Sequence, residues 1–248
     1  MSKKSAKVPE EQSDASSAEA SGAQLLRAVE RILDTPDQIE LQVEESIQEI
    51  RQKLPSDVPG IQIRALAEKK LIARYANRAA LAGGAASLPA IIPGIGTATA
   101  FVGGGLVDMT FCLKYEIEMV LSLASLRGFD IHDPRERQLA YYLAAAHTYE
   151  STPGSVPIAD FLKIEVDAVW HYTPRQLGKI VAILFVKLAI LFSGKGLLRA
   201  VPLMGALVSG GVNKALAHKL GNSVVKMLDL RPEKSAAPAD SEDAEDVA

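Results

Sequence analysis

His147 and Glu150 are three residues apart in a helical segment, so both side chains fall on one helix face. Such a pair could bind a metal ion in a helical bundle, but a bundle site of this kind also needs a Glu-x-x-His unit from another helix. The order here is His-x-x-Glu, and no second copy occurs. We therefore predict no metal site. His147 and His171 are expected near helix C-termini, whose negative end favours a cation.

Other reactive motifs lack the spacing that their chemistry requires. Ser193-Gly194-Lys195-Gly196 follows a helical run and does not match a phosphate-binding loop. Gly94-x-Gly96 lacks the third glycine of a dinucleotide fold. No Gly-x-Ser-x-Gly elbow occurs, and Cys112 lies among apolar residues, where a cysteine packs as a small apolar side chain. We predict no catalytic residue, no cofactor and no enzyme. A hydrolase that uses Asp108, His147 and His171 is the least supported alternative.

Charge and composition bound the remaining function classes. Residues 1–22 have almost nothing to bury, and residues 233–248 hold six acids and one lysine, so both ends are expected to be disordered. The formal net charge is −3, of which the last sixteen residues contribute −5, so residues 1–232 sum to +2. This balance is not that of a nucleic-acid-binding surface. One cysteine and no signal peptide indicate the cytoplasm.

A stretch without any charged side chain runs from Ala79 to Val107. It is long enough to cross a bilayer, but its small residues favour close contact between helices. Peripheral membrane association, a soluble core and a membrane span all remain open. The glycines expected to make close helix contacts, here and in a similar segment near residue 205, are Gly83, Gly84, Gly94, Gly96, Gly103, Gly104, Gly105, Gly205, Gly210 and Gly211.

Basic and polar side chains flank these glycine-rich segments. Lys70, Arg74 and Arg78 recur every four residues, so they form one basic stripe that could contact anionic lipid headgroups. The alternative is a solvated helix face paired with carboxylates. Asp108 and Asn213 are expected to be buried, where each needs a polar partner.

Hydrophobic periodicity is helical throughout the chain, which predicts an all-α bundle over residues 24–230 with disordered tails at 1–22 and 231–248. Thr35, Asp133 and Thr173 each precede a proline and a Glu or Gln, the pattern of a capped helix start. Pro89 and Pro93 break the glycine-rich region into a central helical hairpin. Gly128 is the expected end of the following helix.

Three segments in order resemble the EcsC family of bacterial proteins: Leu88-Pro89 with Pro93-Gly94-Ile95-Gly96, Arg127-Gly128-Phe129-Asp130 with Asp133-Pro134-Arg135-Glu136-Arg137, and Val201-Pro202 with Gly205 and Gly210-Gly211-Val212-Asn213-Lys214. They cover roughly residues 60–228. Ile131-His132 departs from the polar linker expected before the Asp-Pro turn. The resemblance implies association with a membrane or an ABC-type transporter, and it implies no reaction.

Two functions follow from these observations. The first is a non-enzymatic accessory or regulatory protein that associates peripherally with the cytoplasmic face of the inner membrane or with a transporter there. The alternative is a soluble helical protein that binds a lipid or another hydrophobic ligand, with the apolar helix 173–193 as one wall of the cavity.

Overall fold

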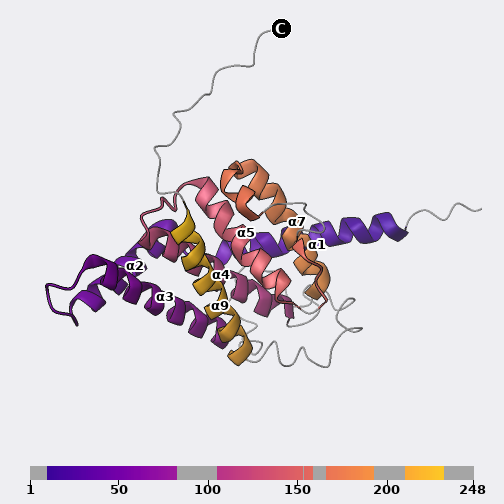
Figure 1. Cartoon of the computed structure of the whole chain (residues 1–248). Coiled ribbons are helices and arrows are strands. Elements are labelled where there is room, and N and C mark those ends of the chain that lie inside the picture. The colour runs from indigo at the N-terminus through magenta and orange to yellow at the C-terminus, as the bar shows by residue number, and fades with distance from the viewer. Residues whose placement is uncertain (1–9, 83–104, 153, 159–165, 193–209, 232–248) are drawn as a thin grey trace, which may run out of the picture.

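The computed structural model describes residues 10–82, 105–152, 154–158, 166–192 and 210–231. Within these ranges the chain forms seven α-helices and one 3-10 helix without a strand, which confirms the predicted all-α fold (Figure 1). The elements are α1 (Glu10–Ile32), α2 (Pro36–Arg51), α3 (Gly60–Ala82), α4 (Gly105–Leu126), α5 (Pro134–Glu150), η2 (Val166–His171), α7 (Pro174–Phe192) and α9 (Gly210–Leu230).

The three predicted helix starts are confirmed, and side-chain caps explain them. The Gln38 amide donates to Thr35 Oγ1 at 3.4 Å, and Gln38 Oε1 accepts from the Thr35 amide at 2.8 Å, which closes a capping box at α2. Thr173 and Gln176 repeat this arrangement at α7. Asp133 accepts from the Arg135 amide at 2.7 Å at α5. Each cap satisfies backbone donors that the helix leaves without partners.

The end of α4 is set by Gly128, as predicted. Its φ of +80° is one that residues with a side chain rarely adopt. The Gly128 amide donates to the Ser125 carbonyl at 2.8 Å, and the Phe129 amide donates to the Ala124 carbonyl at 3.1 Å. These two bonds form a Schellman motif, which redirects the chain into the turn before α5.

Helix α1 begins at Glu10, so the prediction of a disordered tail over residues 1–22 is wrong for residues 10–22. Leu25 and Val29 are buried and fix the second half of the helix on the bundle. The preceding residues are rich in Ala and Glu, which are good helix formers. Helix growth from an anchored segment costs much less than nucleation, so α1 extends towards the N-terminus.

Helix α4 lies at the centre of the bundle and packs against α1, α2, α3, α5 and α9. Most of its residues are buried from Met109 to Ala124. Leu113, Ile117 and Leu123 are completely enclosed in the main hydrophobic core. A helix that is apolar on nearly every side must be surrounded by other helices, and the α4 sequence meets this condition.

Contacts between helices define two ends of the bundle. Arg127 bonds to Glu68 near the start of α3 and to Asp229 near the end of α9, while Ala79 and Ala217 cluster near the other ends of these helices. Helix α9 is therefore antiparallel to α3. We call the end where α3 finishes and α4 and α9 begin the Gly105 end, and the opposite end the Arg127 end. Both ends can be followed in Figure 1.

Helices α5 and α7 also finish at the Gly105 end. Arg231, just after α9, bonds to Glu136 in the first turn of α5, so α5 starts at the Arg127 end. Gly178 of α7 lies next to Gln138 of α5, so these two helices run parallel. The described chain therefore leaves α3 and α7, and enters α4 and α9, at the same end of the bundle.

The predicted glycine- and proline-rich hairpin lies outside the described residues, as do Gly83, Gly84, Gly94, Gly96, Gly103, Gly104 and Gly205. Gly105 and Gly210 are the first residues of α4 and α9, and their surroundings lie outside what the structure describes. Within the part of the chain that the structure describes, no helix has both the length and the apolar character that crossing a bilayer requires.

Close helix contacts occur at two glycines that the sequence reasoning did not select. A Cβ atom on Gly22 would lie 2.6 Å from Val186 Cα of α7, and one on Gly221 would lie 2.7 Å from Ile72 Cγ1 of α3. By contrast, a Cβ atom on Gly211 would meet nothing within 4 Å. The predicted close packing at Gly211 is therefore wrong, because this glycine is exposed at the start of α9.

Gly22→Ala is expected to destabilise the protein by about 1–3 kcal/mol, because the new methyl group overlaps the backbone of α7. Gly211→Ala is the matched control and is expected to be neutral or stabilising by up to about 1 kcal/mol, since alanine is the better helix former. Urea denaturation monitored by circular dichroism measures both. Equal effects of the two substitutions would contradict the close approach of α1 and α7.

Candidate functional site

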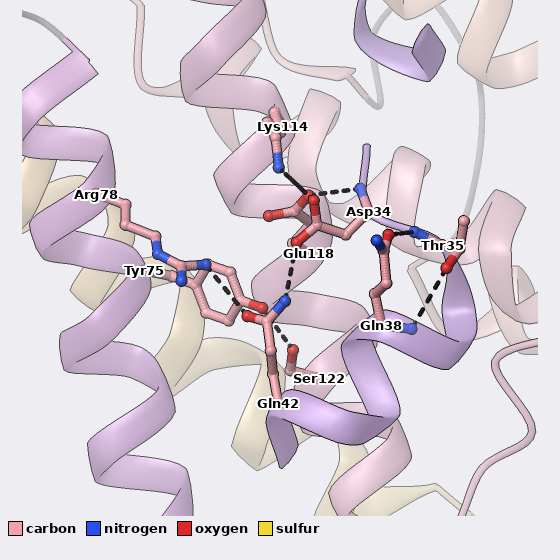
Figure 2. A network of polar contacts seen from close by, with 9 residues as sticks. All are labelled: Asp34, Thr35, Gln38, Gln42, Tyr75, Arg78, Lys114, Glu118 and Ser122. Carbon is pink, nitrogen blue, oxygen red and sulfur yellow. Dashed lines mark hydrogen bonds and ion pairs between the residues drawn. The ribbon is translucent and has the colours of Figure 1, made fainter. Parts of the chain in front are cut away.

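A buried polar network joins the α1–α2 junction to α4 (Figure 2). Glu118 is fully enclosed, and its Oε1 accepts from the Asp34 amide at 2.9 Å and from the Lys114 ammonium. Lys114 Nζ also lies 3.2 Å from Asp34 Oδ1. One ammonium group is thus shared by two carboxylates, and Glu118 Oε2 has no hydrogen-bond partner in the structure.

The network extends from Asp34 through α2 to α3. Gln42 Nε2 donates to Asp34 Oδ2 at 2.9 Å, and Gln42 Oε1 accepts from Arg78 Nη1 at 3.3 Å. The Arg78 guanidinium lies over the Tyr75 ring, 5.3 Å from its centre. Gln42 therefore links Asp34 of the α1–α2 junction to Arg78 of α3.

A neutral hydrogen bond joins α3 to α4 one turn beyond Glu118. The Tyr75 hydroxyl and Ser122 Oγ are 2.9 Å apart, and both residues are fully buried. Burial raises the pKa of the Tyr75 hydroxyl to about 12, so the phenol is neutral at physiological pH.

Burial and charge move the two carboxylates in opposite directions. Burial raises the pKa of Glu118 above its usual value, and the Lys114 ammonium offsets this only in part. Burial also acts to raise the pKa of Asp34, but the hydrogen bond from Gln42 and the charge of Lys114 outweigh it and lower this pKa. The group with an unpartnered buried oxygen therefore holds its proton more tightly than the group with full hydrogen bonding.

This arrangement suits the fixing of helices better than chemistry on a substrate. Glu118, Ser122 and Tyr75 are all shielded from solvent in this conformation. A general acid or base must reach the group with which it exchanges a proton. A buried, hydrogen-bonded ion network instead fixes which helix faces pack together.

The predicted basic stripe faces α2. Lys70 forms an ion pair with Glu49, and Arg74 Nη1 donates to the Gln42 carbonyl at 3.4 Å. Arg78 belongs to the buried network described above. The sequence reasoning placed the three side chains on one face correctly, but it did not identify α2 as their neighbour. Their contact with lipid headgroups stays a prediction.

A second buried cluster joins α4 to α5. Thr148 Oγ1 donates to Glu116 Oε2 at 2.5 Å, and His147 Nδ1 lies 3.6 Å from Glu116 Oε1. Neither ring nitrogen of His147 has a hydrogen-bond partner in the structure. The carboxylate that lies close to His147 is thus Glu116 rather than Glu150, which is exposed on α5.

The remaining predicted residues do not gather into one site. Asn213 is only partly buried on α9, so its prediction as a buried polar residue is wrong. The side chain of Asp108 lies outside what the structure describes. Cys112 forms no disulfide and is partly buried, and His171 is exposed in η2.

Arginines line a surface pocket of about 430 Å³ at the Arg127 end. Its wall includes Arg64, Arg127, Phe129 and Arg231. Arg127 is paired with Glu68 and Asp229. Arg231 is paired with Glu136 and stacks on Phe129, 4.1 Å from the ring centre. These pairings compensate the positive charge of both buried guanidinium groups.

One exposed group brings donors of the metal-binding type together among the residues searched. Atoms of Asp37, Glu40 and His132 lie within 4.8 Å of one another, and His132 Nε2 is 3.6 and 3.5 Å from the two carboxylates. All three residues are exposed. We assign no ion to this group, because exposed carboxylates commonly surround a histidine without one.

Comparisons with known proteins identify no relative: no family model, no curated protein and no solved structure matches this chain. The resemblance to the EcsC family therefore stays a prediction.

The sequence reasoning missed the Lys114–Glu118 network, although a signal was present. Lys114, Glu116 and Glu118 are charged residues in the middle of a helix whose one other charged residue, Asp108, is in its first turn. Charged side chains in a helix that is buried on all sides require partners. The spacing of four residues already allows Lys114 to bond Glu118 within the helix. Asp34 could not be anticipated, because it comes from 80 residues earlier in the chain.

Lys114→Met is expected to destabilise the protein by about 3–5 kcal/mol, because it leaves two carboxylates of a buried network without their cation. Methionine keeps most of the aliphatic stem. Lys70→Met removes an exposed ion pair on the same side of α2 and is expected to leave the unfolding midpoint unchanged. Chemical denaturation of both variants measures the difference, and equal midpoints would contradict a structural role for Lys114.

Glu118→Gln is expected to remove a pH dependence of stability. Because the pKa of Glu118 is raised by folding, its contribution is fully present below the unfolded value near 4.5 and is lost as pH rises through the folded value. Stability of the wild type relative to the variant should therefore fall above pH 4.5, by at most about 1.4 kcal/mol per pH unit. Denaturation across this range tests the sign, which a rising curve would contradict.

Proposed function

We propose that this chain is a non-enzymatic accessory protein that associates peripherally with an anionic membrane surface through the Gly105 end of its bundle. The observation that carries the proposal is that α3 and α7 end, and α4 and α9 begin, at this one end of the bundle, and that the sequence between these helices carries little charge. Residues 83–104 contain no charged side chain, and residues 193–209 contain just Lys195 and Arg199.

Exposed apolar side chains at this end support the proposal. Leu81, at the end of α3, has 76% of its surface exposed, and Ile190, near the end of α7, has 42% exposed. A large apolar side chain gains about 1.5–3 kcal/mol when it leaves water. Combined with weak attraction between lysines and headgroups, a few such side chains give reversible binding.

The EcsC resemblance adds a setting to this physical argument. Under this proposal the membrane is the cytoplasmic face of a bacterial inner membrane, and an ABC-type transporter is a partner on that surface. The same resemblance implies no reaction, which agrees with the absence of a catalytic motif from the sequence. Binding of a soluble lipid-like ligand stays the alternative, and a co-purifying acyl chain in a protein that ignores vesicles would favour it.

Flotation with vesicles tests the proposal. The wild type should float with phosphatidylcholine vesicles that contain phosphatidylglycerol, and it should float less with phosphatidylcholine alone. Leu81→Glu places a charge at the Gly105 end and is expected to reduce the bound fraction about tenfold or more, because the burial of one leucine is lost.

Leu230→Glu is the matched control, since Leu230 is 84% exposed at the Arg127 end. It should float like the wild type. A wild type that stays in the soluble fraction with both kinds of vesicle would overturn the proposal. Equal losses in the two variants would show that the Gly105 end is not the point of contact.

A further inference from the structure

Charge is divided unequally among the helices. Helix α1 carries five acidic and two basic residues. Helix α2 carries five acidic residues and one basic residue. Helix α3 carries five basic residues and one acid, and α9 carries three lysines and one acid. The two acids of α3 and α9 are Glu68 and Asp229, and both are paired with Arg127. The antiparallel α3–α9 pair therefore carries a net charge of +6, from +4 on α3 and +2 on α9, and α7, with three basic residues and no acid, is another basic helix of the described bundle.

Two of the three lysines of α9 lie on its outer face. Lys219 and Lys226 are seven residues apart, which is almost two full turns, so they point in the same direction. Ala217, Leu220 and Val224 are buried on the other side. Lys214, Lys219 and Lys226 are all exposed, and none forms an ion pair with a described residue.

Helix α3 adds a lysine beside this face. Lys69 is exposed and comes three residues before Ile72, the residue that contacts Gly221 of α9. It has no ion pair among the residues described, in contrast to the adjacent Lys70, which is bonded to Glu49 of α2. We call Lys69, Lys219 and Lys226 the α3–α9 basic face. Helices α3 and α9 lie side by side in Figure 1.

We propose that the α3–α9 basic face lies flat against the anionic bilayer, so that α3 and α9 run along the membrane surface while the Gly105 end enters it. This inference rests on the proposed function and specifies its orientation and its cationic contacts. The contacts are these unpaired lysines rather than Lys70, Arg74 and Arg78, whose groups are engaged with α2.

Distance separates this orientation from an upright one. Lys226 is 16 residues from the start of α9, which corresponds to about 24 Å along the helix axis. Lys69 is 13 residues from the end of α3, or about 20 Å. In a bundle that stands on its Gly105 end, both lysines would be well beyond the screening length of about 10 Å in 0.1 M salt. Their charges then would not affect binding.

The test is a triple charge reversal, Lys69→Glu, Lys219→Glu and Lys226→Glu in one full-length chain. Its matched control reverses Arg51, Lys53 and Lys179, which are exposed on α2, the following turn and α7, and gives the same net charge. Binding is measured by flotation with phosphatidylcholine vesicles containing phosphatidylglycerol. The first variant should lose at least about 100-fold in partition coefficient, while the control should lose much less.

The outcomes distinguish the two proposals. If the wild type does not bind these vesicles, the proposed function fails. If the wild type binds and the two triple variants bind equally well, the flat orientation fails and the proposed function stands. Tighter, reversal-sensitive binding of the wild type to a DNA duplex than to vesicles would overturn the assignment of the face to lipid. Circular dichroism melting of both variants verifies their folding.

Single substitutions provide a second measurement that does not depend on the triple variant. Lys226→Gln removes one charge at an exposed position far from the Gly105 end. It should lower the partition coefficient about fivefold in about 0.1 M salt, and the effect should vanish in about 1 M salt, where screening extends over only about 3 Å. An unchanged partition coefficient at low salt would overturn the flat orientation.

Discussion

The arrangement of the helices depends on the pairing of two carboxylates with one ammonium group between the α1–α2 junction and α4. Lys114 lies between Asp34 and Glu118, and the Asp34 amide of the α1–α2 junction donates a further hydrogen bond to Glu118. Apolar packing alone would allow α2 to slide along α3 and α4, because hydrophobic contacts are non-directional. The ion network allows one register, since any displacement would strand a charge in a region of low dielectric constant.

This register has a consequence for the surface. With α2 fixed over α3, Glu49 pairs with Lys70 and Gln42 accepts from Arg74 and Arg78, whereas Lys69 of α3 and the lysines of α9 form no ion pair with a described residue. The helices that are rich in acids and those that are rich in bases are thus arranged so that one face stays positive on a chain whose net charge is −3. Net charge therefore gives little guidance to the surface that a partner would meet.

The sequence predicted local structure well and neighbours poorly. Caps such as Thr35–Gln38 depend on a few adjacent residues, so the starts of these helices could be predicted from the local sequence. The four-residue spacing from Lys70 to Arg78 placed these residues on one face, but the neighbour of that face depends on packing between distant segments. Close approach at Gly22 depends on the position of Val186, more than 160 residues later. The composition of the first turns of α1 predicted disorder, because the apolar residues that anchor this helix on the bundle, Leu25 and Val29, lie farther along it.

The contact of Arg231 with aromatic rings gives the molecule an internal optical reporter. Trp170, the single tryptophan of the chain, lies under this guanidinium at 5.2 Å, and its carbonyl accepts a bond from Arg135. Indole emission therefore arises where the last turn of α9 meets η2 and α5. Undocking of that turn would expose the ring to water, so steady fluorescence during any other event would show that this junction stays intact.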